Sequence, residues 1–230
     1  GAVSMVMDNC LDEGQAVVVP EISWESYELM AREDLLEYRT YQVFEGNHFN
    51  LASFKQVCRQ VMQEQKKLLV IINDPCHNPT GYSMTDAEWS EVIAFLNDCA
   101  KEGPVILLND VAYMDYAFDL EQSRKYLNHF NDISDNLLVV VAFSCSKTMT
   151  AYGMRCGAAL VLSSSQKNVD DVTMLFEKTA RSTWSNVNNA AMETFTTLTT
   201  EKKEQFLQEK AKYIRLLQER SQVFLQEAQA

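Results

Sequence analysis

The chain has 230 residues, of which 32 are acidic and 20 are basic, so its formal net charge is −12. With 47% hydrophobic and 23% charged residues, the composition is that of a globular chain and excludes a disordered or collagen-like one. The acidic balance argues against a broad nucleic-acid or anionic-membrane surface, because both need clustered Lys and Arg. We therefore expect neither nucleic acid nor a membrane among the partners, and any anion site must be local.

Short apolar runs alternate along the chain with longer segments of helical period. The runs are apolar on successive residues, which is typical of strands buried on both faces. The strongest helical segment begins with a capping box at Thr85 and Glu88. In chain order, the pattern predicts a strand over 16–19, a helix over 54–62, a strand over 68–72, a helix over 84–102, strands over 105–108, 137–143 and 158–162, and helices over 172–176 and 201–229.

This alternation predicts an α/β fold, a three-layer sandwich with a mostly parallel central sheet and helices on both faces. No internal repeat or interdomain linker is visible, so we expect residues 1–230 to form one domain. The chain starts without Met and ends within a long helical pattern, and we expect it to be a piece of a longer protein.

The six cysteines form no CxxC pair and have no close spacing to any of the three histidines. This distribution disfavours a metal centre and a disulfide framework, and scattered thiols in apolar stretches are typical of a reducing compartment. The longest apolar run, 137–143, is far shorter than a membrane helix, and no signal peptide is visible. We expect a cytoplasmic location.

Polar residues directly after the predicted strands are the candidates for chemistry, because ligands of open α/β sheets gather beyond the carboxyl ends of strands. Taken singly, each has a plain structural interpretation. The turn at 78–81 is ordinary Pro and Gly turn chemistry, Asp110 could cap the next segment, and Lys147 could be a solvated lysine. The candidate segments are 73–81, 109–113, 144–147 and 152–157.

In this order and spacing, the segments carry a more specific pattern. Asn-Pro-Thr-Gly at 78–81 is followed by Asp-x-Ala-Tyr at 110–113, by Ser-x-x-Lys at 144–147, and by Arg155 eight residues after that lysine. The chain resembles, over nearly all its length, the large cofactor-binding domain of class I/II aminotransferases, which are fold type I pyridoxal-phosphate enzymes related to aspartate and aromatic amino-acid aminotransferases.

The resemblance implies a role for each motif residue at the pyridoxal 5'-phosphate ring. Lys147 matches the lysine that forms the Schiff base, and a lysine that is partly desolvated near other cations loses its proton more easily. Asp110 matches the carboxylate that keeps the ring nitrogen protonated, so that the ring acts as an electron sink. Tyr113 and Asn78 match the residues that hydrogen-bond the phenolic oxygen of the cofactor. Trp24 resembles the aromatic residue stacked on the ring.

The resemblance also implies a phosphate site. Ser144 and Arg155 match its donors, and Arg offers bidentate geometry. Ser146 is a further candidate contact. Gly1 and Ala2 resemble the tail of a Gly-rich phosphate loop at a helix N-terminus, where backbone N–H groups favour an anion. We interpret Tyr152 and His77 as structural residues, which is why neither joins the predicted site.

The activity implied is transfer of an amino group between an L-amino acid, aromatic or aspartate-like, and a 2-oxo acid. Nine residues after Trp184, the family's dicarboxylate-selecting segment would place an arginine, but this chain has Glu193, which would repel a side-chain carboxylate. The substrate therefore stays open. A pyridoxal-phosphate lyase or synthase and a ligand-sensing domain of a transcription regulator are the alternatives.

The resemblance further implies that an N-terminal segment and a C-terminal small domain of the family lie outside these 230 residues. The family's site is built between two subunits, so we expect a homodimer of the full-length protein. The strands and helices should supply an adequate core, and the chain alone should fold. It should be a poor catalyst, because the groups that orient the substrate lie in the absent parts.

Overall fold

The computed structural model describes residues 1–228, which divide into two compact units. The first unit contains residues 1–144 and 157–186, and the second contains residues 145–156 and the chain from 187 onward. The whole central sheet lies in the first unit. None of the described helices combines the length and apolar character that crossing a membrane requires.

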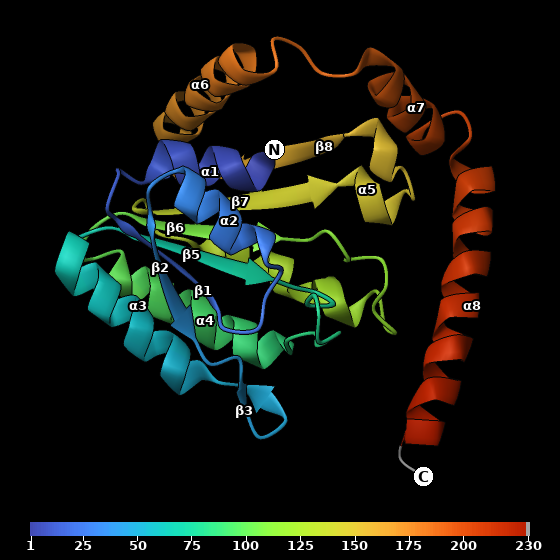
Figure 1. Ribbon diagram of the computed structural model, residues 1–230, viewed down its shortest axis with the longest axis horizontal. Helices are drawn as coiled ribbons and strands as arrows, with labels where there is room; N and C mark the ends of the chain where they lie inside the picture. Colours follow the sequence, from blue (N-terminus) through green and yellow to red (C-terminus); the bar gives the residue numbers. More distant parts are fainter. Residues whose placement is uncertain (229–230) are drawn as a thin grey trace. The chain divides into compact units, whose positions relative to one another are not determined.

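A six-stranded sheet with the order β2-β1-β5-β6-β7-β8 forms the centre of the first unit (Figure 1). All neighbouring strands are parallel except β8, which runs antiparallel to β7. The predicted mostly parallel sheet is thus confirmed. The strands are β1 (Ala16–Pro20), β2 (Glu37–Tyr41), β5 (Leu68–Asn73), β6 (Val105–Asp110), β7 (Leu137–Ser144) and β8 (Gly157–Leu162), and a separate antiparallel pair joins β3 (Phe44–Glu45) to β4 (His48–Phe49).

Helices cover both faces of this sheet, as the three-layer prediction requires (Figure 1). Alternate side chains of one strand enter different clusters: Val70 packs with one set of helices and Ile71 with the other. One face carries α3 (Leu51–Gln65), α4 (Asp86–Cys99) and the 3₁₀ segment η1 (Gln122–Asp132), and the other carries α1 (Ala2–Cys10), α2 (Ser26–Glu33) and α6 (Gln166–Thr183).

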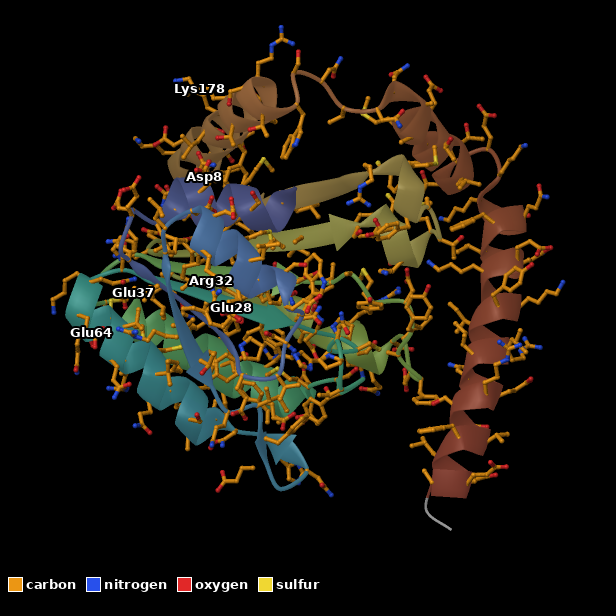
Figure 2. All side chains as sticks on the ribbon, viewed as in Figure 1. Asp8, Glu28, Arg32, Glu37, Glu64 and Lys178 are labelled. Carbon is orange, nitrogen blue, oxygen red and sulfur yellow. The ribbon has the colours of Figure 1, made fainter. Side chains whose placement is uncertain are left out.

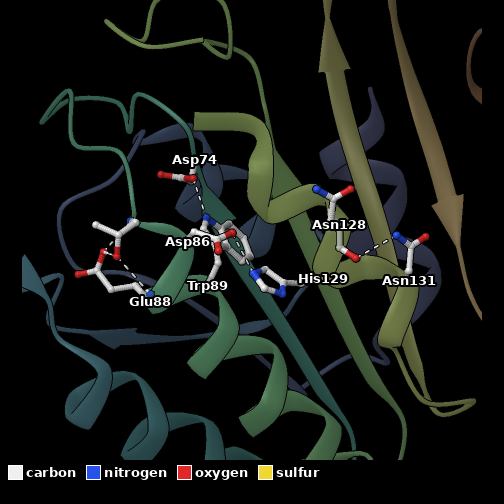
Figure 3. A network of polar contacts seen from close by, with 8 residues as sticks. Asp74, Asp86, Glu88, Trp89, Asn128, His129 and Asn131 are labelled. Atoms are coloured by element: carbon white, nitrogen blue, oxygen red, sulfur yellow. Dashed lines mark hydrogen bonds and ion pairs between the residues drawn. The ribbon is translucent and has the colours of Figure 1, made fainter. Parts of the chain in front are cut away.

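The helix starts show why these segments fold locally. The predicted capping box of α4 is present, because Thr85 Oγ1 accepts the Glu88 N–H at 3.2 Å and Glu88 Oε2 accepts the Thr85 N–H at 2.7 Å (Figure 3). Helix α3 is longer than predicted, since Asn50 caps its start and Lys66 ends it in the left-handed region. Each cap supplies a partner for otherwise unpaired backbone groups.

The sequence did not predict several elements, and four of them are β2, α1, α2 and α7. Strand β2 is an edge strand with mostly exposed side chains, so it lacks the continuous apolar run of the central strands. Helix α1 buries only a narrow stripe, Val3, Val6 and Met7, and α2 buries only Tyr27 and Ala31. The fourth element, α7 (Asn189–Thr199), belongs to the second unit. Short helices with few buried positions give a weak periodic signal.

The second unit contains α5 (Cys145–Thr148), the 3₁₀ turn η2 (Tyr152–Met154), α7 and α8 (Lys203–Ala228). Residues 145–156 connect β7 to β8, and the Cys145 N–H donates to the Cys156 carbonyl at 3.0 Å, which closes this loop at its base. The predicted long helix is confirmed as α8 over 203–228. We call residues 145–156 the lysine loop.

Many charged side chains lie on the outside of the first unit, among them Asp8, Glu28 and Glu64 (Figure 2). Glu28 and Arg32 form an ion pair one turn apart on α2, and Glu37 of β2 forms an ion pair with Arg39 at 2.6 Å. Such exposed pairs contribute at most about 1 kcal/mol each. The fold therefore depends on the two apolar clusters on either face of the sheet.

Candidate functional site

The carboxyl ends of β5 and β6 lie side by side, because Asn73 is paired with Asp110 in the register of the two strands. The buried Asn73 amide links two predicted site residues. Its Nδ2 donates to the Asp110 carbonyl oxygen at 2.8 Å, and its Oδ1 accepts the Asn78 N–H at 2.7 Å. Asn73 thus fixes the backbone of the 78–81 turn against the end of β6.

Asp110 is a buried carboxylate, with 7% of its surface exposed. Two donors contact it: Tyr27 Oη donates to Oδ2 at 2.6 Å, and the Ala112 N–H donates to Oδ1 at 3.1 Å. Burial raises the pKa of Asp110, and the two hydrogen bonds oppose that rise. Among the described residues, no cationic side chain forms an ion pair with it. A buried carboxylate in this state favours a nearby cation.

A second buried carboxylate, Asp74, closes the segment that contains Asn78. Its Oδ1 accepts the Met84 N–H at 2.7 Å, and its Oδ2 accepts Trp89 Nε1 at 2.8 Å (Figure 3). Burial raises the pKa of Asp74 to about 7 despite these two donors. The Asp74 carboxylate therefore joins the two ends of the segment 74–84 and attaches this segment to Trp89 of α4.

The 78–81 turn itself has the expected chemistry. Gly81 has a φ of 73°, which favours glycine, and its N–H donates to the His77 carbonyl at 2.6 Å. His77 is buried, and its Nδ1 lies 2.8 Å from Thr80 Oγ1 within the turn. Burial lowers the pKa of His77, which favours the neutral ring. The contact of the His77 ring with Thr80 lies within the turn.

Two aromatic residues predicted to face the cofactor lie in the same unit as Asp110. Tyr113 is half-buried, three residues after the end of β6, and its ring is 6.1 Å from that of Tyr116. Trp24 lies two residues before the start of α2 and has 43% of its surface exposed. The Trp24 ring contacts Tyr27 edge to face, with centroids 5.5 Å apart.

The residues predicted to bind the cofactor phosphate come from three places in the chain. Gly1 is the N-cap of α1 and Ala2 its first residue, so both lie at a helix N-terminus. Ser144 is the last residue of β7 and is half-buried. Ser146 and Arg155 belong to the lysine loop, where Arg155 Nη1 lies 3.5 Å from Ser146 Oγ.

Two cationic side chains of the lysine loop lie over the same aromatic ring. Lys147 Nζ lies 5.0 Å from the centroid of the Tyr152 ring, and the Arg155 guanidinium carbon lies 4.9 Å from it. Arg155 Nη1 also donates to the Tyr152 carbonyl at 2.7 Å. Tyr152 has 63% of its surface exposed, so it is not a packing residue of a core. The interpretation of Tyr152 as plain packing therefore needs correction.

No site role was predicted from the sequence for three residues that organise these groups. Asn73 and Tyr27 hold Asp110 and its neighbouring turn, and Tyr152 contacts both cations of the lysine loop. Asn73 had a usable signal, because it is the first polar residue after an apolar strand. Tyr27 had none, since it is separated from Asp110 by 83 residues.

Comparison with known proteins gives a consistent result. The profile of the family described as "Aminotransferase class I and II" matches residues 1–230. A tyrosine aminotransferase of Rhizobium meliloti (strain 1021) is 34% identical over 116 residues, which are 50% of this chain and 28% of that protein. An aspartate aminotransferase of Salmonella typhi is 28% identical over 170 residues, which are 74% of this chain and 41% of that protein.

Solved structures agree with these relatives. An aminotransferase from Anaerococcus prevotii superimposes with a TM-score of 0.96 and 35% identity, over 100% of this chain and 57% of that one. An aromatic-amino-acid aminotransferase from Burkholderia pseudomallei, described as covalently bound to pyridoxal phosphate, gives a TM-score of 0.74 at 21% identity, over 94% and 52% of the two chains. The chain spans less than half the length of the two curated relatives and little more than half that of the two solved structures.

Proposed function

The chain belongs to the class I and II aminotransferases, and from this premise we propose that residues 1–230 are the pyridoxal-phosphate-binding large domain of a transaminase. The observation that carries the proposal is Asp110: a carboxylate at a strand end, 7% exposed, with two neutral hydrogen-bond donors and no cationic partner among the described residues. A group with a protonated ring nitrogen supplies the missing positive charge. The donor set in this part of the chain therefore fits the cofactor of the family.

When bound, pyridoxal phosphate supplies an aldehyde that bonds to amines and a ring that delocalises the electrons released from the substrate carbon. The chain's own residues would hold and orient it. Lys147 Nζ would carry it covalently and, once released by the incoming amino acid, move a proton at the substrate carbon. Asp110 would keep the ring nitrogen charged.

The remaining predicted residues would fix the orientation of the cofactor. Tyr113 and Asn78 would donate to its phenolic oxygen, and Trp24 would cover one face of its ring. Asn73 supports this set because it holds the Asn78 amide and the Asp110 carbonyl at once. A fixed orientation matters, since positioning of reacting groups can contribute about 7 kcal/mol or more.

The phosphate would be held by donors from separate elements. Ser144, Ser146 and Arg155 supply hydroxyl and guanidinium groups, and Gly1 and Ala2 add the N-terminus of α1. The contact of Arg155 with Tyr152 keeps the guanidinium beside Ser146 in the lysine loop. Tyr152 would thereby organise the lysine and one phosphate donor together.

The proposed reaction transfers an amino group from an L-amino acid to a 2-oxo acid. Relatives named for aspartate and for tyrosine support an aromatic or aspartate-like substrate. We further propose that this chain is part of a longer protein, because its matches cover only 41% and 57% of two relatives. The resemblance to the family supports a homodimer of that longer protein.

The test uses the full-length protein loaded with pyridoxal phosphate and given one amino acid, L-tyrosine or L-aspartate, without an acceptor. A transaminase converts the amino acid to its 2-oxo acid and leaves pyridoxamine phosphate in equal amount. Lys147→Ala should abolish both products, while Lys101→Ala, at an exposed ion-pairing lysine, should not. Release of ammonia or of a carbon–carbon cleavage product with no pyridoxamine phosphate would contradict the proposal and favour a lyase.

A further inference from the structure

A buried phenol contacts the buried carboxylate Asp110. Tyr27 is fully buried on α2, and its hydroxyl donates to Asp110 Oδ2 at 2.6 Å. The phenol belongs to the apolar cluster between α1, α2, α6 and the sheet, which also contains Val19 and Ile71. Packing on all sides leaves the Tyr27 ring little freedom, so its hydroxyl is held toward one oxygen of Asp110.

The donor type matters as much as its position. A buried carboxylate needs hydrogen bonds to stay charged, and a charged acceptor strengthens each bond. A lysine or arginine at position 27 would also supply a donor, but its positive charge would pair with the carboxylate and compete with a cationic ligand. A phenol stabilises the negative charge of Asp110 without neutralising it.

We propose that Tyr27 is a positioning residue that fixes the Asp110 carboxylate and keeps it ionised for the ring nitrogen of the cofactor, an inference that rests on the proposed function. The Ala112 N–H holds the other oxygen, so the two donors together define the plane of the carboxylate. Tyr27 acts through Asp110 and need not touch the cofactor itself.

The electrostatic surroundings support this role. Burial and the nearby Asp110 carboxylate raise the pKa of Tyr27 well above 10, so the phenol stays protonated and remains a donor at every practical pH. The other titratable groups near this pair are Tyr38, Tyr41 and Asp74, whose own N–H donates to the Asp110 carbonyl at 3.2 Å. None of these three carries a positive charge that would replace the phenol.

Tyr27 also links Asp110 to the aromatic residue proposed to cover the cofactor ring. Trp24 lies three residues earlier, and the Tyr27 N–H donates to the Trp24 carbonyl at 3.0 Å. The two rings meet edge to face. One buried side chain therefore supports both the carboxylate and the stacking residue.

The experiment uses the full-length protein and measures the dissociation constant of pyridoxal phosphate as a function of pH. It compares the unaltered protein with the Tyr27→Phe and Tyr41→Phe variants. Tyr41 is a matched control, because it is also a buried tyrosine but its hydroxyl faces the Ile71 carbonyl at 3.4 Å, which does not titrate. The Tyr27→Phe variant loses a hydrogen bond to a charged group. Its dissociation constant for pyridoxal phosphate should therefore rise about tenfold or more at neutral pH.

The acid limb of the binding curve gives the specific signature. Tyr27→Phe should move its midpoint to higher pH, because Asp110 without the phenol protonates more easily. Tyr27→3-fluorotyrosine keeps the shape and donates more strongly, so it should move the midpoint to lower pH. This second variant decides the matter even if Tyr27→Phe fails to fold.

The outcomes separate the two proposals. If the unaltered protein fails to bind pyridoxal phosphate, the proposed function is wrong. If it binds but Tyr27→Phe and Tyr27→3-fluorotyrosine leave the midpoint where Tyr41→Phe leaves it, the role of Tyr27 is wrong and the proposed function stands. A uniform weakening at all pH values would assign Tyr27 a packing role and overturn the inference.

Discussion

Asp74 should make the stability of the protein fall as the pH rises from about 4 to about 7. Its pKa is about 7 in the folded chain, whereas an aspartate in the unfolded chain titrates near its ordinary value of about 3.9. Between these values the folded state holds a proton that the unfolded state has released. The contribution of Asp74 to the free energy of unfolding is therefore fully present below the unfolded pKa and is lost as the pH rises through the folded pKa. Over this window the free energy of unfolding falls by about 1.4 kcal/mol per pH unit and by about 4 kcal/mol in all.

The assay is urea unfolding at a series of pH values from 4 to 8, followed by the fluorescence of the buried Trp89. Asp74→Asn removes the titrating group and should flatten the dependence over this window, although it also loses one acceptor for Met84 or Trp89. Asp8→Asn, at an exposed carboxylate on α1, is the control and should keep the slope of the unaltered protein (Figure 2). Equal slopes for Asp74→Asn and the unaltered protein would refute the reasoning.

Three further predictions concern Asn73, Gly157 and Asp110. Asn73→Ala leaves the Asn78 N–H and the Asp110 carbonyl without their partner, so the free energy of unfolding should fall by about 1–3 kcal/mol; no loss in urea unfolding would show that other groups replace the amide. Gly157→Ala places a Cβ 2.6 Å from a backbone oxygen and should destabilise by about 1–3 kcal/mol, whereas Gly153→Ala, with open space around it, should change the midpoint little. Asp110→Asn in the full-length enzyme should lower turnover by several orders of magnitude, and near-normal kcat would contradict its role.

The parts of the fold that the sequence predicted have strong local signals. Strands β5, β6 and β7 are buried on both faces and therefore read as continuous apolar runs, and the Thr85 capping box marks the start of α4. The edge strand β2 escaped prediction because most of its side chains are exposed and the pattern is not apolar. The other edge strand, β8, was predicted because its residues are apolar, but its expected burial on both faces is wrong, since most of its side chains are exposed.

Some features of the candidate site could likewise be predicted from the sequence, and others could not. Lys147, Asp110 and the 78–81 turn follow predicted strands, so their positions at strand ends could be inferred from the sequence. The contact between Tyr27 and Asp110 could not, since it depends on how α2 packs against the sheet. The cations around Tyr152 depend on the path of a short loop, which residue spacing alone does not determine.

Borohydride reduction of the protein with bound pyridoxal phosphate tests the central claim most directly. Reduction makes the covalent attachment permanent, and digestion followed by mass spectrometry locates it. We expect a label on the single peptide that contains Lys147, and no label at that position after Lys147→Ala. Label on another lysine, or an unchanged yield of attached cofactor in Lys147→Ala, would contradict it.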